Sequence, residues 1–333
     1  MNNSTARFDL IAIGDSTIDT FIKVHDATVT FDLIRKSGKI CFPYGDKIPV
    51  DAIDYGVAGN AANVVIGCQK LGLNCAIYTN LGDDDQGKRI NNTFEAEGVG
   101  LDYVVVAKET RSNLSVVLTF QGERTIFVYH QDWNYSLPKL ADCGWVYLTS
   151  MAETFTSSNI MGDICRYLDR SRAKLVYGPG TYQLKADVKR YPRILEKCEV
   201  LIVNREEAMK ILQIGPTENL QMRDLLSGLI MAGPKAVVIT DGVEGSYATD
   251  GQSFLKAGVV PTRITEKTGA GDAYSAGLLA ALFKGETLEE AMVWGTINAS
   301  AVVSRITTQG GQLTMDELLT QRKKIKDFKA VKF

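Results

Sequence analysis

Short apolar segments alternate with segments of helical periodicity along most of this chain, and no other feature constrains its fold as strongly. Residues 8–14 have the sequence "FDLIAIG", and the runs "WVYLTS", "KLVYG", "VLIVN" and "AVVIT" follow, each with the length of a buried strand. A segment of helical character, such as residues 59–72, precedes or follows each run. Strands that alternate with helices favour a parallel sheet covered on both faces. The sequence therefore predicts an α/β fold.

Two segments interrupt this alternation. Residues 21–55 are rich in β-forming residues and have no helical period. Residues 112–130 alternate in polarity, turn at "QGE" and continue, which is typical of a hairpin. We expect both segments to lie outside the main sheet as a small β lid. The predicted organisation is one domain over residues 1–333, with a lid from about 20–56 and 109–131.

Composition excludes several classes of protein. A net charge of −2 over 333 residues provides no basic field for nucleic acid or an anionic membrane. No apolar run approaches the ~18 residues of a membrane span, and the first residues lack the features of a signal peptide. The six cysteines form no C-x-x-C pair, which favours buried free thiols in a reducing cytoplasm. With only two histidines, histidine-rich metal sites and Ser-His-Asp catalysis are not expected.

The stretch "KTGAGDAYSAGLLAAL" has the features of an anion pocket. Gly269 and Gly271 allow positive φ and close approach of the backbone to another group. The helix predicted after them offers unpaired N–H groups and the positive end of its dipole. The pattern is neither a Walker A loop nor a dinucleotide fingerprint. For Asp272 the residues alone leave two roles open: catalysis beside the anion, or a helix-start residue worth ~1 kcal/mol.

The same stretch resembles the C-terminal signature of the ribokinase-like, or PfkB, carbohydrate kinase family. Four further segments resemble family motifs and occur in the family's order across nearly the whole chain. These segments are "GDSTID", "AGNAANVVIGCQKLGLNCAIYTNLGDDDQG", "VNREEA" and "ITDGVEGSY". The resemblance implies a ribokinase-like three-layer α/β/α sandwich with a mostly parallel central sheet and a small β-sheet lid.

The resemblance also implies an activity. Such a kinase, dependent on ATP and Mg²⁺, transfers the γ-phosphoryl group to a primary hydroxymethyl group of a sugar. Phosphoryl transfer depends mainly on positioning and charge stabilisation. The N–H groups of Gly269, Ala270 and Gly271 would hold the developing charge. Asp272 would accept the hydroxyl proton, a general-base step worth about 10²–10⁴ in rate.

The resemblance assigns sugar contacts near the start of the chain. Asp19 aligns with the family's acceptor of sugar hydroxyl hydrogen bonds, and a carboxylate can accept two. Gly59, Asn60 and Asn63 align with the glycine and asparagine contacts to the sugar. Asn60 can also serve as the N-cap of the following helix. For the nearby Asp15 we expect a structural role, capping the turn at the end of the strand.

Asn204 and Glu207 have the spacing of a capping box, which explains both residues structurally. The resemblance places the same segment near Mg²⁺ and phosphate, where Asn204 would contact ATP. Glu207 would act partly through water, because Mg²⁺ keeps several of its waters. The two roles are compatible.

Further nucleotide contacts are implied in the second half of the chain. Thr240, Gly242 and Gly245 align with the family's nucleotide-side loop, where a hydroxyl and backbone N–H groups meet phosphate. Asn298 falls where the family lines the adenine pocket, although small residues around it also suit helix packing.

The chain departs from the family pattern before the glycine loop. Asp-Thr-Thr is frequent there, and this chain has Glu266, Lys267 and Thr268. Glu266 keeps the acidic charge on a longer side chain, so a monovalent cation such as K⁺ can be held there. Lys267 would reach a phosphate or point to solvent.

The identity of the acceptor stays open between several classes. Arg111 lies in the predicted lid, in a Thr-Arg-x-Asn pattern frequent in phosphosugar kinases, and would grip a substrate phosphate. Against this, the helix after Asn63 lacks the arginine that such kinases often carry. The long segment 21–55 suits a nucleoside substrate or a homodimer formed through the lid. A sugar kinase is expected first, then a nucleoside kinase, then a phosphosugar kinase. A non-catalytic sugar- or nucleotide-binding regulator is disfavoured by Asp272 and its two glycines.

Overall fold

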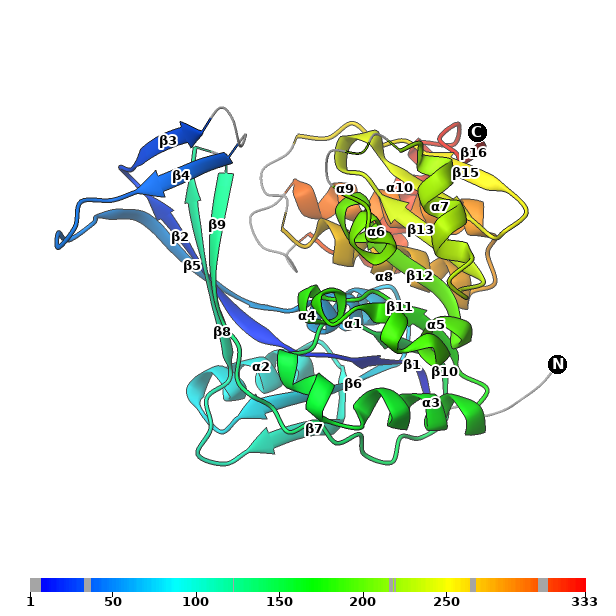
Figure 1. The fold of residues 1–333 in the computed structure, drawn as a ribbon, viewed down its shortest axis with the longest axis horizontal. Coiled ribbons are helices and arrows are strands. Elements are labelled where there is room, and N and C mark those ends of the chain that lie inside the picture. The colour runs from blue at the N-terminus through cyan, green and yellow to red at the C-terminus, as the bar shows by residue number, and fades with distance from the viewer. Residues whose placement is uncertain are drawn as a thin grey trace.

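A computed structural model describes residues 7–32, 37–121, 123–215, 218, 220–263, 268–304 and 311–333 (Figure 1). Its central sheet has, in spatial order, β16 (Val331–Lys332), β15 (Phe254–Ala257), β14 (Ser246–Thr249), β13 (Ala236–Thr240), β12 (Cys198–Asn204), β11 (Lys174–Tyr177), β10 (Cys143–Leu148), β1 (Phe8–Ile13), β6 (Cys75–Gly82) and β7 (Gly100–Ala107). The strands from β7 to β13 in this order are parallel. The remaining three pair antiparallel at one edge.

Helices cover both faces of this sheet, and β1 shows why. Leu10 and Ala12 are buried in one core, whereas Ile11 and Ile13 are buried in the other, because successive side chains of a strand point to opposite faces. The first core is closed by α1 (Asn60–Lys70), α2 (Asp85–Ala96), α8 (Ala270–Phe283), α9 (Leu288–Val303) and α10 (Met315–Lys324). The second is closed by α3 (Ile160–Arg170), α4 (Thr181–Lys185), α5 (Pro192–Lys197), α6 (Arg205–Leu212) and α7 (Met222–Ile230).

The predicted fold class is therefore confirmed. The structure is a three-layer α/β/α sandwich with a mostly parallel sheet. Short 3₁₀ turns, η1 (Glu153–Ser157), η2 (Val188–Arg190) and η3 (Gly242–Glu244), lie between the main elements. Within the described residues, no helix combines the length and apolar character needed to cross a membrane.

A second sheet extends away from the sandwich (Figure 1). Its order is β5 (Val50–Ala58), β2 (Thr17–Val24), β8 (Asn113–Phe120) and β9 (Glu123–Tyr129). We call these four strands the lid. A separate two-stranded ribbon joins β3 (Thr28–Asp32) to β4 (Ser37–Cys41). The predicted hairpin is confirmed, because β8 and β9 pair antiparallel from Phe120 and Glu123 onward.

All six cysteines lie in the described part of the chain, and all are free thiols. Five are buried, as the sequence predicts, and the sixth, Cys41 of β4, is exposed. Burial raises the pKa of the Cys68 thiol, so this side chain stays protonated and packs as a small apolar group.

Candidate active site

The glycine loop opens α8 as the sequence predicts, but its two glycines differ. Gly269 is the N-cap residue, with φ of 81° in the left-handed region. Gly271 lies in the first helical turn and is not among the glycines with positive φ, so that part of the prediction is wrong. A Cβ at Gly271 would meet nothing within 4 Å. The space in front of Gly271 is therefore open, and no side chain among the described residues caps the first turn of α8.

Asp272 lies in this first turn, so it is a helix-start residue but not the N-cap. Its Oδ2 accepts a hydrogen bond of 2.8 Å from Nδ2 of Asn63, 209 residues away in the sequence. Burial raises the pKa of Asp272 to about 7; the hydrogen bond from Asn63 opposes this rise, and the charges of Glu207 and Asp19 add to it. The two signature segments thus meet at the carboxylate of Asp272.

The start of α1 presents Asn63 to this carboxylate. Gly59 is the N-cap, with φ of 98°, and a Cβ there would lie 2.7 Å from the Asp15 carbonyl oxygen. Close packing on the backbone after β1 therefore explains this glycine. Asn60 is the first helical residue and is exposed, so the N-cap role that we expected for it is wrong. Asn63 is 4% exposed.

Asp19 reaches the site from β2 of the lid. It pairs with Gly56 of β5 and Ser115 of β8, which places the three residues on one face of the lid. Burial raises the pKa of Asp19 to about 6, while a hydrogen bond with Ser115 and the charge of Arg124 act in the opposite direction. The charge of Asp19 contributes to the raised pKa of Asp272.

Asp15 has a structural role, but not the one expected. Its carboxylate accepts hydrogen bonds from the Tyr135 hydroxyl at 2.7 and 2.9 Å and from the Ala152 N–H at 2.8 Å. It therefore joins distant segments instead of capping its own turn. Burial raises the pKa of Asp15 to about 7.

The capping box predicted at the start of α6 is confirmed. Asn204 Oδ1 accepts from the Glu207 N–H at 2.9 Å, and Glu207 Oε2 accepts from the Asn204 N–H at 2.8 Å. Asn204 lies beside Thr240 at the carboxyl ends of the parallel strands β12 and β13. Burial raises the pKa of Glu207, and the charge of Glu207 in turn raises the pKa of Asp272.

The loop after β13 brings the other predicted nucleotide residues to the same edge of the sheet. Gly242 and Gly245 have φ of 53° and 92°, and a Cβ at Gly245 would lie 2.1 Å from the Ala257 carbonyl oxygen. The Tyr274 hydroxyl of α8 donates to Ser246 Oγ at 2.9 Å. This bond connects the helix that carries Asp272 to the strand that follows the loop.

The side chain of Asn298, which we expected near adenine, makes its hydrogen bonds with protein groups. Its side chain is fully buried in α9, and Nδ2 donates to the Ala273 carbonyl oxygen at 2.8 Å and to Gln312 Oε1 at 3.1 Å. Its Oδ1 accepts from the Leu313 N–H at 3.0 Å. The amide is therefore engaged by protein groups, which argues against the predicted contact.

Arg111 is exposed, in the segment between β7 and β8. Glu266 and Lys267, which we considered for a monovalent cation and a phosphate, lie outside the described residues.

Arg124 of β9 is a residue of the candidate site that was not predicted from the sequence. Its Nη1 donates to Thr268 Oγ1 at 2.5 Å, so the lid contacts the residue just before Gly269. The hairpin register was the available signal, because it puts Arg124 on the lid face of Asp19.

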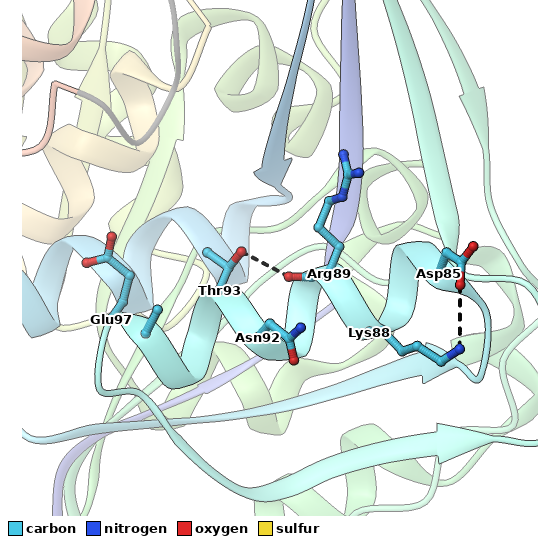
Figure 2. A pocket seen from close by; sticks show the side chains of 7 residues that line it. Asp85, Lys88, Arg89, Asn92, Thr93 and Glu97 are labelled. Carbon is cyan, nitrogen blue, oxygen red and sulfur yellow. Dashed lines mark hydrogen bonds and ion pairs between the residues drawn. The ribbon is translucent and has the colours of Figure 1, made fainter.

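A hollow of about 410 Å³ lies elsewhere, on the outward side of α2 (Figure 2). Its lining comes from that one helix and includes Asp85, Lys88 and Glu97. None of the residues gathered around Asp272 lines it, so the hollow is a surface feature separate from the candidate site.

Comparison with known families agrees with this geometry. The profile of the "pfkB family carbohydrate kinase" matches residues 19–315, which span the lid, both signature segments and α9. The chain belongs to the pfkB family of carbohydrate kinases. It is therefore a phosphotransferase with a sugar acceptor.

Several relatives of this pfkB family kinase share the name 5-dehydro-2-deoxygluconokinase. The 5-dehydro-2-deoxygluconokinase of Halalkalibacterium halodurans is 24% identical over 332 residues, which cover 93% of each chain. Solved structures share the fold. The Arabidopsis thaliana ribokinase complexed with ribose and ATP gives a TM-score of 0.78 at 18% identity and covers 94% of this chain and 98% of its own. The Methanocaldococcus jannaschii nucleoside kinase gives 0.75 at 20% identity, covering 95% and 98%.

Proposed function

We propose that this kinase transfers the γ-phosphoryl group of Mg-ATP to a primary hydroxymethyl group bound between the lid and the start of α8. The observation that carries the proposal is the contact between Asn63 and Asp272. It joins the segment assigned to the sugar with the segment assigned to the phosphoryl group. Asp19, on the lid face above them, provides a further acceptor for sugar hydroxyl groups.

Asp272 is the proposed general base. Burial raises the pKa of its carboxylate to about 7, which is close to neutral pH. That value suits a base, because general-base catalysis is most efficient when the pKa lies near the working pH. The proton of the acceptor hydroxyl would pass to Asp272 as the oxygen attacks phosphorus. The bond from phosphorus to the oxygen that bridges it to ADP then breaks.

The first turn of α8 is the proposed anion hole. The N–H groups of Gly269, Ala270 and Gly271 lie in the turn where a helix leaves its N–H groups unpaired. The positive end of the helix dipole adds to their effect. Open space in front of Gly271 would accommodate the transferred phosphoryl group.

ATP would lie along the edge formed by Asn204, Thr240, Gly242 and Gly245. Support comes from the register that pairs Asn204 with Thr240 and from the Arabidopsis thaliana ribokinase complexed with ribose and ATP, which shares the fold. Among the described residues, no three acidic, histidine or cysteine side chains gather as a metal cluster. This fits Mg²⁺, which is commonly held by phosphates, waters and one or two carboxylates.

Glu207, beside the proposed phosphate edge, would be such a carboxylate, acting through water. When bound, Mg²⁺ would neutralise charge on the phosphates. A K⁺ site that includes Glu266 remains a prediction.

For the acceptor we propose a sugar acid of the 5-dehydro-2-deoxygluconate type. The relatives' name supports this substrate, which has a carboxylate in addition to hydroxyl groups. The chain adds a cation where such a substrate would lie, because Arg124 is on the same lid face as Asp19. An arginine fork matches a carboxylate.

An ADP-release assay with Mg-ATP tests the acceptor class. The panel contains 5-dehydro-2-deoxygluconate, ribose, a nucleoside and fructose 6-phosphate. We expect the highest kcat/KM with the sugar acid and no effect of Arg111→Ala on its KM. Preference for the nucleoside, or for the sugar phosphate with an Arg111→Ala defect, would replace the proposed acceptor.

A further inference from the structure

A buried glutamine lies behind the Asn63–Asp272 pair. Gln312 is 6% exposed, and its Nε2 donates to the Asn63 carbonyl oxygen at 2.7 Å. Its Oε1 accepts from Asn298 Nδ2 at 3.1 Å. The side chain of Gln312 therefore joins α1 to α9 through both ends of one amide.

The hydrogen bonds around Gln312 form a closed ring. Asn298 Nδ2 also donates to the carbonyl oxygen of Ala273, the residue after Asp272, at 2.8 Å. Asp272 in turn accepts from Asn63 Nδ2. The ring thus runs from Asn63 through Gln312, Asn298 and Ala273 to Asp272 and back to Asn63.

The packing of α1 against α8 leaves room for this amide. A Cβ on Gly67 of α1 would lie 2.2 Å from Gln312 Oε1 and 2.7 Å from the Cβ of Ala276 in α8. Only glycine at this position lets the glutamine lie between the two helices without a shift. A buried amide costs free energy unless it is hydrogen-bonded, whereas an apolar side chain would pack there without that requirement.

We propose that Gln312 is a positioning residue for phosphoryl transfer, because it fixes the first turn of α1 and thereby the direction from which Asn63 donates to Asp272. This inference rests on the function proposed above for Asp272. Gln312 touches neither the sugar nor the reacting atoms in this account. Its effect reaches the carboxylate through Asn63 and through the Asn298–Ala273 link.

The charged and titratable groups around Asp272 make this effect measurable. Among the residues that the structure describes, they come from the lid, α6 and the central sheet: Asp19, Glu207 and the buried Tyr147 of β10. A substitution at Gln312 leaves all three in place. If the bond from Asn63 weakens, the ionised form of Asp272 loses a donor, and the pKa of Asp272 rises.

The test compares Gln312→Met with the parent kinase, using the acceptor found by the ADP-release panel. Methionine keeps the length of the side chain and removes both hydrogen bonds. We expect kcat to fall by about 10- to 100-fold, because small misplacements of a catalytic group have effects of this size. We expect KM for both substrates to change little and the acid limb of kcat to move to higher pH.

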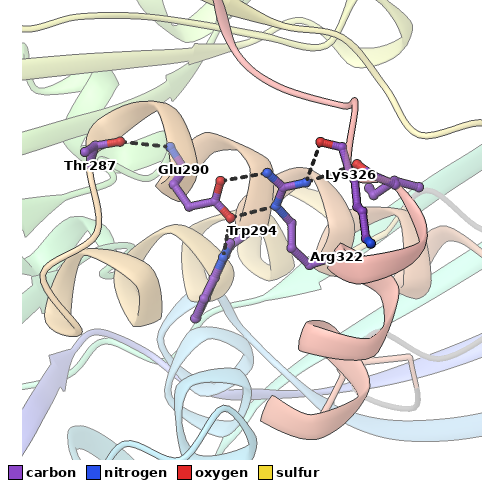
Figure 3. Close-up of polar contacts among 6 residues, drawn as sticks. Thr287, Glu290, Trp294, Arg322 and Lys326 are labelled. Carbon is purple, nitrogen blue, oxygen red and sulfur yellow. Dashed lines mark hydrogen bonds and ion pairs between the residues drawn. The ribbon is translucent and has the colours of Figure 1, made fainter.

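Arg322→Met is the matched control (Figure 3). Arg322 of α10 donates to both carboxylate oxygens of Glu290, at 2.7 and 3.0 Å, near the opposite end of α9 from Asn298. Loss of the Arg322 guanidinium also removes a partly buried contact between α10 and α9, so it should lower the melting temperature. We expect kcat and the acid limb of the Arg322→Met variant to match those of the parent.

A double-mutant cycle completes the test. In an Asn63→Ala background, Gln312→Met should lower kcat by less than it does in the parent, since part of its effect passes through the bond from Asn63 to Asp272. An unmoved acid limb with parental kcat in Gln312→Met would overturn the inference and leave the proposed function intact. If Gln312→Met does not fold, Gln312→Leu gives the same readout, because it also removes both hydrogen bonds and adds no charge. An inactive parent would overturn the proposed function and this inference with it.

Discussion

At the scale of single residues, the site consists of carboxylates held in surroundings that oppose their charge. Burial raises the pKa of Asp272 to about 7 and that of Asp19 to about 6. The hydrogen bond from Asn63 limits the rise at Asp272. A base with such a value is ionised often enough to act and basic enough to accept a proton.

The pH dependence of kcat follows from this value. Asp272 accepts a proton only when it is ionised, so activity should fall as the pH drops below about 7 and Asp272 becomes protonated. Steady-state rates measured from about pH 5 to pH 9 check this.

Asp15 supplies the control, because burial raises its pKa to about 7 as well. If the fall in kcat at low pH is due to protonation of Asp272, it persists in Asp15→Asn. Loss of this fall in Asp15→Asn, or a kcat that does not change with pH in the parent, would contradict the assignment of the fall to Asp272.

Residue types at the site were largely predictable, and their partners were not. Asp272, Asn63 and Asp19 follow from motifs in the sequence. The bond between Asn63 and Asp272 depends on how α1 packs against α8, which no local pattern records. The same holds for Gln312, whose role depends on contacts with two helices, and for Asn298, whose buried amide bonds to Ala273, Gln312 and Leu313.

At the scale of elements, α8 and α9 approach so closely that backbone meets backbone. A Cβ at Gly277 of α8 would lie 2.6 Å from the Trp294 carbonyl oxygen. A Cβ at Gly295 of α9 would lie 2.9 Å from the Tyr274 carbonyl oxygen. This contact sets the position of the helix that begins with the glycine loop.

Gly277→Ala should therefore destabilise the protein. An added methyl group meets backbone that cannot move aside easily, and overpacking of this kind costs about 1–3 kcal/mol. Urea unfolding measures the change in the free energy of unfolding. Gly56→Ala in β5 is the control, because a Cβ there meets nothing within 4 Å. Equal stability of the two variants would show that the helices separate without cost.

Element starts illustrate what local sequence can determine. The capping box of Asn204 and Glu207 was predictable, because its hydrogen bonds span three residues. The N-cap of α1 was not. Gly59 occupies it because the backbone of Asp15 lies 2.7 Å from where its Cβ would be, a contact set by tertiary packing.

At the scale of the whole molecule, the lid has two different faces. One face carries Asp19 and Arg124. The other face carries large apolar side chains that are about half exposed: Ile53, Tyr55, Phe127 and Tyr129. Ile126 and Val128 are also exposed, on the face of Asp19. An exposed apolar face of this kind is typical of an interaction surface. The existence of the lid was predictable from its β pattern, whereas its register required the folded chain.

The homodimer expected from the sequence remains a prediction, and this face makes it testable. Phe127 is 57% exposed, and Phe127→Lys would place a charge in the proposed interface. We expect the parent to sediment as a dimer. The variant should dissociate into monomers at protein concentrations at which the parent is still a dimer. Val106→Lys in β7, which is exposed outside the lid, should leave the sedimentation coefficient unchanged. A monomeric parent would contradict the prediction.

The central claim is that Asp272 accepts the proton of a sugar hydroxyl group during phosphoryl transfer. Its most direct test is single-turnover ADP formation by Asp272→Asn and by the parent, with both substrates saturating. The account predicts a loss of about 10²–10⁴ in rate with substrate affinities nearly unchanged. Parental turnover by Asp272→Asn would contradict it.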